Sequence, residues 1–309
     1  MKKSARNVLV RFGLVVLMAS LSSWASGWHD AGAKWKRVLE EKAPAEDHLA
    51  ARDALARRQA VAAIALLRSG RTESVWPLLQ HSPDPSLRSY LIRDIGRSGV
   101  KPDLLVRRLE IEMDVSVRQA LILSLGAFTE DELPPSKGNA LIPRLLRLYR
   151  DDPDAGVHSA IDWLLRHGRQ GLMDRPLDWK QGIGLRVIDE ELAGRPPGGR
   201  NWFVTKEGHT LAMLRGPIEF TMGAPTYEPG RNKSPEEALH RVRIPRSFAV
   251  ATKEVTVARF QRFLEANPAI KKAAQAAGAR DPSKGGRMLS RSSPNTLHLR
   301  ILIREATLR

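Results

Sequence analysis

Few residues in this sequence have the types and spacing that chemistry requires. The chain contains no cysteine, which excludes disulfides, thiolate metal sites, iron–sulfur clusters and cysteine nucleophiles. His240 follows the acidic pair Glu236 and Glu237, but it has no His or Asp partner at metal-ligand spacing. We therefore predict no catalytic, cofactor-binding or metal-binding residue, and no cofactor.

Three arginines recur at a constant interval and form the clearest repeating set of charged side chains. Arg58, Arg88 and Arg118 stand 30 residues apart. One such side chain per repeat could form a ladder that binds acidic groups. We favour instead an ion pair between each arginine and a carboxylate of a neighbouring repeat, because an unpaired buried charge is costly.

These arginines belong to a longer sequence repeat. Four segments align, with spacings of 30, 30 and 40 residues, at 58–64, 88–93, 118–123 and 158–163. The last three follow similar turns, in which Asp84, Asp114 and Asp154 stand where a helix begins. Each carboxylate can accept a hydrogen bond from the free N–H groups there and oppose the helix dipole. The repeat therefore predicts a series of capped helices.

Partner helices are expected between the aligned segments, at 74–79, 102–109 and 141–149, and residues 129–139 are predicted to form a longer loop. Several segments close on a glycine that fits a helix C-terminus, namely Gly70, Gly99 and Gly168. Over residues 29–194 the pattern resembles a HEAT-like α-solenoid of about four helix pairs, a fold that offers a concave face to proteins. The alternative is that these helices only support the domain that follows.

The pattern changes after residues 195–200, a Pro- and Gly-rich stretch that we interpret as a linker. Short β-prone runs bounded by Gly or Pro predict strands at 202–204, 210–214, 218–222, 241–244 and 248–250. Apolar residues at helical spacing predict a helix over 257–266, which Pro268 follows. The chain is thus expected to be mainly α, with an α+β domain over 201–268.

Three motifs in this second region carry a family resemblance. They are Phe220-Thr221-Met222-Gly223, the acidic pair before His240 and Val242, and Glu254-Val255-Thr256 followed by Phe260 and Phe263. In order and spacing they resemble the start of the formylglycine-generating enzyme family, also called sulfatase-modifying factor domains. One departure is Ala238-Leu239, where the family usually has a proline before the histidine.

The resemblance implies an oxidase that converts a sulfatase cysteine to formylglycine with a copper-binding cysteine pair. This chain has no cysteine, and after Trp202 it has no tryptophan, so the family's later motifs are missing. We therefore expect a truncated, non-catalytic domain, with Phe220, Phe248, Phe260 and Phe263 as core residues of the parent fold and with apolar faces left uncovered. A frameshift or premature stop explains such a chain. An oxidase completed by a separate chain is the enzymatic alternative.

Residues 1–28 have the features of an export signal. Lys2, Lys3 and Arg6 precede an apolar run, and small residues at Ser23 and Ala25 suit cleavage after Ala25. Residues 8–28 could equally be an uncleaved anchor, because about 21 residues cross a bilayer core of roughly 30 Å. Either reading predicts an exported or membrane-anchored, extracytoplasmic protein. The repeat and the second domain together also resemble the extracytoplasmic half of bacterial membrane Ser/Thr kinases, although no kinase motif is present.

The charge of the chain is strongly positive. Its 50 Lys and Arg and 34 Asp and Glu give a formal net charge of +16. Residues 269–309 hold nine Lys and Arg against Asp281 and Glu305, a net charge of +7, and we expect this tail to be disordered. The tail has no aromatic residue for base stacking, so nucleic-acid binding is disfavoured, although binding to an anionic surface stays an alternative. The expected partner is a protein, bound by the helical repeats.

Overall fold

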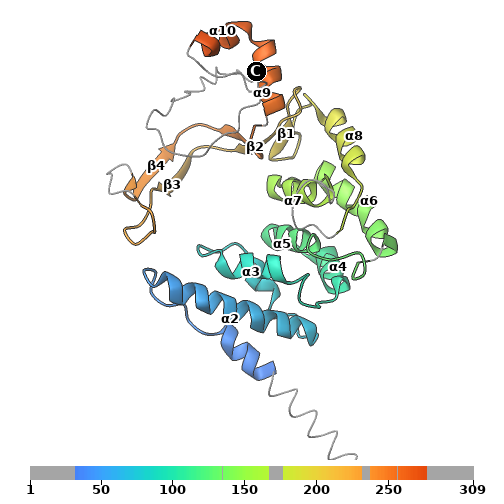
Figure 1. The fold of residues 1–309 in the computed structure, drawn as a ribbon, viewed down its shortest axis with the longest axis vertical. Coiled ribbons are helices and arrows are strands. Elements are labelled where there is room, and N and C mark those ends of the chain that lie inside the picture. Colours follow the sequence, from blue (N-terminus) through green and yellow to red (C-terminus); the bar gives the residue numbers. More distant parts are fainter. Residues whose placement is uncertain (1–31, 134, 167–176, 232–236, 256, 277–309) are drawn as a thin grey trace, which may run out of the picture. The chain divides into compact units, whose positions relative to one another are not determined.

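The computed structural model describes residues 32–133, 135–166, 177–231, 237–255 and 257–276. The chain is mainly α-helical and carries small antiparallel sheets, which confirms the coarse fold class (Figure 1). It divides into two compact units, Met1–Lys253 and Glu254–Arg309. The segment predicted as an export signal or anchor and Gly168 lie outside the described residues. Within the described ranges, no helix has the length and apolar character needed to cross a membrane.

The first unit begins with helices. Residues 32–39 are helical, and the elements that follow are α2 (Leu49–Arg68), η1 (Trp76–Leu79), α3 (Ser86–Asp94), α4 (Pro102–Ile111), α5 (Val115–Leu125), α6 (Pro135–Asp151), α7 (Ala155–Arg166) and α8 (Gly182–Leu192). The helix α2 packs against α3, α3 against α5, and α5 against α7 (Figure 1). The elements between them pack against this row, with η1 on α3 and α5, α4 on α5, and α6 on α7. The four aligned sequence segments therefore form one continuous row of helices.

A single apolar core runs between these helices. Leu67, Leu91, Leu121 and Ile161 are fully buried, one from each helix of the row. Burying such side chains contributes about 1.5–3 kcal/mol each relative to leaving them exposed. Because each helix buries one face against its neighbours, the row is held together by contacts between successive sequence repeats.

The predicted capping aspartates are confirmed at two helices. Asp114 Oδ1 accepts the Val117 N–H at 3.0 Å, and Asp154 Oδ1 accepts the Val157 N–H at 2.8 Å. At α3 the residue in the N-cap position is Pro85, and Asp84 Oδ1 accepts the Ser86 N–H at 3.0 Å instead. The carboxylates thus mark the helix starts, as the repeat predicts.

The structure differs from the sequence prediction in two connecting segments. Part of the predicted loop 129–139 is helical, since α6 begins at Pro135; proline tolerates this place because the first turn of a helix needs no N–H donor. The helix predicted over 74–79 is only the short 3₁₀ turn η1, which starts at Trp76 with Pro77 next to it. Gly70 directly follows the C-cap of α2 and has a φ of 77°, which confirms it as a helix C-terminal glycine. Gly99 also has a positive φ, of 70°, but it lies in the turn after α3, because that helix ends at Asp94.

All five predicted strands form, in two antiparallel sheets. The first has the order β1 (Trp202–Val204), β2 (Thr210–Leu214) and β5 (Phe248–Ala251). The second pairs β3 (Ile218–Met222) with β4 (His240–Ile244), placing Phe220 opposite Val242 and Met222 opposite His240. The first sheet continues directly from the helices, because β1 contacts α8 and Trp202 is fully buried.

The β3–β4 pair has an apolar face that is largely open. Ile218, Phe220 and Met222 alternate with Glu219 and Thr221, so the apolar side chains share one face of the strand. Phe220 is 41% exposed and Met222 is 53% exposed. An apolar face is therefore uncovered here, and Phe220 is not part of a core in this structure.

The second unit contains α9 (Val257–Ala266) and α10 (Pro268–Ala276). Here α9 has the predicted bounds, and the rings of Phe260 and Phe263 stack 6.2 Å apart. Phe263 is exposed. The helix α10 includes the first residues of the predicted tail, and residues 277–309 lie outside the described part of the chain.

Candidate functional site

The three repeated arginines do not form a free ladder. Arg118 pairs with Asp152 of the next repeat at 3.0 Å, and Arg58 pairs with Glu41 at 2.5 Å. Arg88 forms no ion pair with a carboxylate among the described residues; its Nε donates to the Leu79 carbonyl at 2.8 Å and one terminal nitrogen donates to the Ser116 carbonyl at 3.1 Å. The prediction of an ion pair with a neighbouring repeat is therefore confirmed for Arg118 and wrong for Arg88, which bonds to carbonyl oxygens. Arg58 does pair with a carboxylate, but Glu41 precedes the first aligned segment.

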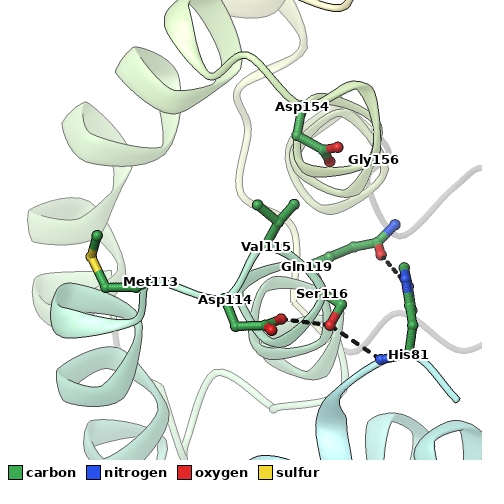
Figure 2. Close-up of a pocket in the computed structure, with 8 residues that line it drawn as sticks. All are labelled: His81, Met113, Asp114, Val115, Ser116, Gln119, Asp154 and Gly156. Carbon is green, nitrogen blue, oxygen red and sulfur yellow. Dashed lines mark hydrogen bonds between the residues drawn. The ribbon is translucent and has the colours of Figure 1, made fainter. Parts of the chain in front are cut away.

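A surface pocket lies where the N-termini of α5 and α7 approach the loop after η1. Its volume is about 550 Å³. Eight residues line it, namely His81, Met113, Asp114, Val115, Ser116, Gln119, Asp154 and Gly156 (Figure 2). The pocket thus combines carboxylate, imidazole and amide groups with apolar side chains.

Hydrogen bonds between successive repeats fix the polar wall of this pocket. The His81 backbone N–H donates to Ser116 Oγ at 3.1 Å, and Ser116 Oγ donates to Asp114 Oδ1 at 2.6 Å (Figure 2). The His81 imidazole Nε2 lies 3.2 Å from Gln119 Oε1. The Ser116 hydroxyl, followed by the Val117 N–H, lowers the pKa of Asp114, so its carboxylate is charged at neutral pH.

Gly156, in the opposite wall, allows two of the pocket side chains to approach its backbone closely. A Cβ atom at this position would lie 2.9 Å from Asp154 Oδ1 and 2.9 Å from Gln119 Nε2, closer than carbon normally approaches either atom. The aligned positions in the two preceding repeats are Ser86 and Ser116. The missing side chain therefore lets Asp154 and Gln119 lie close to each other at the start of α7.

An apolar ridge borders the pocket on the connection from α4 to α5. We define this ridge as Ile111, Met113 and Val115, of which Ile111 is 71% exposed and Met113 is 88% exposed. Glu112 and Asp114 between them have extended backbone angles, so alternate side chains point to opposite sides. Glu112 is buried and bonded to Arg108 at 2.7 Å, which holds the ridge residues outward. Exposed apolar clusters of this kind often mark interaction sites.

A second polar centre is buried between α6, α7, α8 and the end of β5. Arg166 donates to Asp162 at 2.7 Å and to Asp189 at 2.6 Å, Tyr149 donates to Asp189 at 2.5 Å, and Lys253 pairs with Asp162. Burial alone would raise the pKa of Asp162, but Lys253 and Arg166 outweigh it and lower that pKa. Burial, followed by the charges of Asp162 and Asp189, raises the pKa of Tyr149. These groups satisfy one another, as in a centre that stabilises the fold.

His158 joins this centre to the first sheet. Its ring stacks between Tyr149 and Trp202, with ring centres 4.1 Å and 3.7 Å away, and its Nδ1 donates to the Tyr149 carbonyl at 2.8 Å. Trp202 Nε1 donates to the Asp152 carbonyl at 2.8 Å. Burial lowers the pKa of His158 to about 4, so the imidazole is neutral at pH 7.

The residues that carry the family resemblance are spread over both units. The Phe220 motif ends β3 and His240 begins β4, whereas Glu254, Val255, Phe260 and Phe263 belong to the second unit. The His240 side chain is exposed, and its Nδ1 lies 2.7 Å from the Ala238 carbonyl. In the described part of the chain, no three His, Asp or Glu side chains gather in a way that could hold a metal ion. No family model, no curated protein and no solved structure matches this chain.

The sequence interpretation did not predict the pocket, the ridge or the buried polar centre. The alternation of Ile111, Met113 and Val115 with acidic residues was a signal for the ridge, and the Asp162–Arg166 spacing of four was a signal for the buried centre. Nothing local indicated that His81 would meet Gln119, since these side chains are 38 residues apart. The pocket depends on how successive repeats stack.

Proposed function

We propose that this chain is a non-catalytic protein-interaction scaffold, in which helical repeats of the HEAT-like type bind a partner protein through the pocket and the apolar ridge. The proposal includes an exported or membrane-anchored location, supported by the basic and then apolar start of the sequence. The β-rich region and α9 represent the N-terminal part of a sulfatase-modifying-factor-type domain, supported by the three motifs and their order.

One observation carries the binding proposal. The ridge exposes Ile111 and Met113 directly beside a pocket with polar walls, whereas Glu112 between them is buried. The Met113 side chain is apolar and 88% exposed, so covering it with a partner would remove apolar surface from water. Methionine side chains are flexible and are common at protein-binding surfaces. Methionine is enriched at protein interfaces, which combine apolar contacts with hydrogen bonds.

The row α2, α3, α5 and α7 supports the helical-repeat part of the proposal. Stacks of this kind present the same element of each repeat along one edge, and binding sites gather there. In this chain that edge holds Asp84, Asp114 and Asp154 with the pocket between the last two. Two walls of the site therefore come from successive repeats.

Composition supports a non-catalytic role. The copper-binding cysteine pair that the resemblance implies for family enzymes has no counterpart in a sequence without cysteine. Mass spectrometry of a cysteine-containing sulfatase peptide incubated with copper, oxygen and the purified chain should show no formylglycine. Formation of the aldehyde would overturn this part of the proposal and favour the oxidase alternative.

Site-specific photo-crosslinking in the producing cell tests the binding proposal. A photoreactive amino acid at Met113 should give one discrete crosslinked protein, whereas the same group at the exposed Ile183 of α8 should not. The double substitution Ile111→Ser and Met113→Ser should abolish recovery of that protein, and Ile183→Ser should leave it unchanged. Identical crosslinks from both positions, or none from Met113, would refute the scaffold function assigned to this site.

A further inference from the structure

The three capping aspartates differ in what their second carboxylate oxygen does. In each repeat Oδ1 accepts a backbone N–H at the start of the helix. The second oxygen of Asp84 accepts two bonds from the Arg52 guanidinium, at 2.9 and 3.1 Å. The second oxygen of Asp114 accepts the Gln80 amide at 3.2 Å. Each of these donors comes from the preceding part of the chain.

Asp154 breaks this series. Its Oδ1 caps α7 and its own N–H donates to Asp152, but in the described part of the chain no donor reaches Oδ2. Asp154 lines the pocket, across from His81 and Gln119 (Figure 2). Gly156 lets this carboxylate and the Gln119 amide lie close together, because a Cβ there would be 2.9 Å from each of them. The structure therefore presents a charged acceptor in a cavity large enough to admit a side chain.

The charge around the pocket favours a cation. Asp114 and Asp154 line it, and none of the eight lining residues is Lys or Arg. Two arginines near the pocket bond to other groups. Arg88 donates to the Ser116 carbonyl and to Gln119 Oε1, and Arg118 pairs with Asp152. Asp84, at the position aligned with Asp154, binds the Arg52 guanidinium at 2.9 Å. A capping carboxylate in this repeat can therefore hold a guanidinium with its second oxygen.

We propose that the pocket binds an arginine side chain of the partner protein, with its guanidinium on Asp154 Oδ2 and an aliphatic neighbour of that arginine on Met113 and Val115. The inference rests on the proposed scaffold function and specifies what the partner must present. An arginine suits the site better than a lysine, because a guanidinium can place two N–H groups on one carboxylate oxygen, as Arg52 does on Asp84 Oδ2. The partner segment is then basic and apolar at adjacent positions.

Asp154→Asn is the discriminating variant. Asparagine caps a helix as well as aspartate does, so α7 keeps its N-terminal hydrogen bond while the negative charge is removed. Asp84→Asn is the matched control, because it changes the same charge at an aligned cap that already has Arg52 as its partner. Circular dichroism should show both variants folded.

A phage-displayed library of random dodecapeptides, panned against the full chain, supplies the probe. Wild type and Asp84→Asn should enrich peptides in which arginine adjoins an aliphatic residue, and Asp154→Asn should not. For an enriched peptide, replacing its arginine by neutral citrulline should weaken binding about tenfold or more in fluorescence polarisation, as for loss of a charge-assisted hydrogen bond.

The outcomes separate the two proposals. Enriched peptides without arginine, or equal binding to Asp154→Asn, would overturn the arginine inference while the photo-crosslinks from Met113 still support the scaffold. Peptides whose binding is unaffected by the double substitution Ile111→Ser and Met113→Ser, together with no crosslinks, would overturn both.

Discussion

Arg118 and Asp152 form a 3.0 Å ion pair between successive repeats, and only 2% of the Asp152 side chain is exposed. Asp152 also accepts the Asp154 N–H at 2.9 Å, so one carboxylate links α5 to the start of α7. Removing one partner of a buried pair leaves an uncompensated charge, which is more costly than loss of the contact itself.

We expect Arg118→Met to lower the free energy of unfolding by about 3–5 kcal/mol, since Asp152 stays buried and unpaired. Arg58→Met is the control, because the Arg58–Glu41 pair is largely exposed and should change stability by less than about 1 kcal/mol. Urea unfolding followed by circular dichroism gives both values. Equal effects of the two substitutions would contradict a structural role for the Arg118–Asp152 pair.

The buried His158 predicts a loss of stability in acid. Its pKa is about 4 in the folded chain and about 6.5 when unfolded, so between these values the unfolded state binds more protons. The stabilisation is complete above pH 6.5, decreases as the pH falls toward 4, and amounts to roughly 3 kcal/mol. Asp162, with its lowered pKa, adds a separate loss only as the pH falls below 4.

Urea unfolding at intervals from pH 4 to pH 7 measures this slope. In His158→Gln the slope over that window should be much smaller, although the variant is less stable at neutral pH because the Tyr149 and Trp202 rings lose their partner. A wild-type stability that is flat between pH 4 and pH 6.5 would show that His158 is not buried in its neutral form.

Local patterns in the sequence were enough to predict the strands, α9 and the capping aspartates. Each of these depends on neighbours: β-prone residues between Gly or Pro, or an aspartate one turn before a backbone N–H. The first turn of α6 was missed because Pro135 and Gly138 look like loop residues, although proline fits a helix start. The predictions about export, the family and the partner stay predictions.

Contacts between distant residues could not be predicted in this way. Lys253 and Asp162 are 91 residues apart, and Tyr149 and Asp189 are 40 apart. Their meeting depends on how α6, α7, α8 and the segment after β5 pack, which no local spacing specifies. The free oxygen of Asp154 is a related case, since it is recognisable only after the three capping aspartates are compared in the structure.

The open face of the β3–β4 pair predicts association of the chain at high concentration. Phe220→Ser and Met222→Thr together should reduce light scattering in concentrated solution and leave the urea midpoint nearly unchanged, because both side chains are exposed. Phe128→Ser, at a fully buried position, should instead destabilise the fold by about 3–5 kcal/mol. Scattering that is insensitive to the double substitution would show that this face does not drive association.

Gly156 and Gly184 should respond in opposite ways to alanine. Alanine in place of glycine within a helix stabilises by about 0.5–1 kcal/mol, and at Gly184 the nearest atom lies at an ordinary 3.5 Å. At Gly156 the new methyl group would lie 2.9 Å from Asp154 Oδ1 and displace the cap of α7, which costs about 1 kcal/mol. Gly184→Ala should therefore raise the urea midpoint, whereas Gly156→Ala should leave it unchanged or lower it and should abolish crosslinking from Met113. A clear gain in stability for Gly156→Ala with crosslinking retained would mean that the close approach of Asp154 and Gln119 to Gly156 does not shape the pocket.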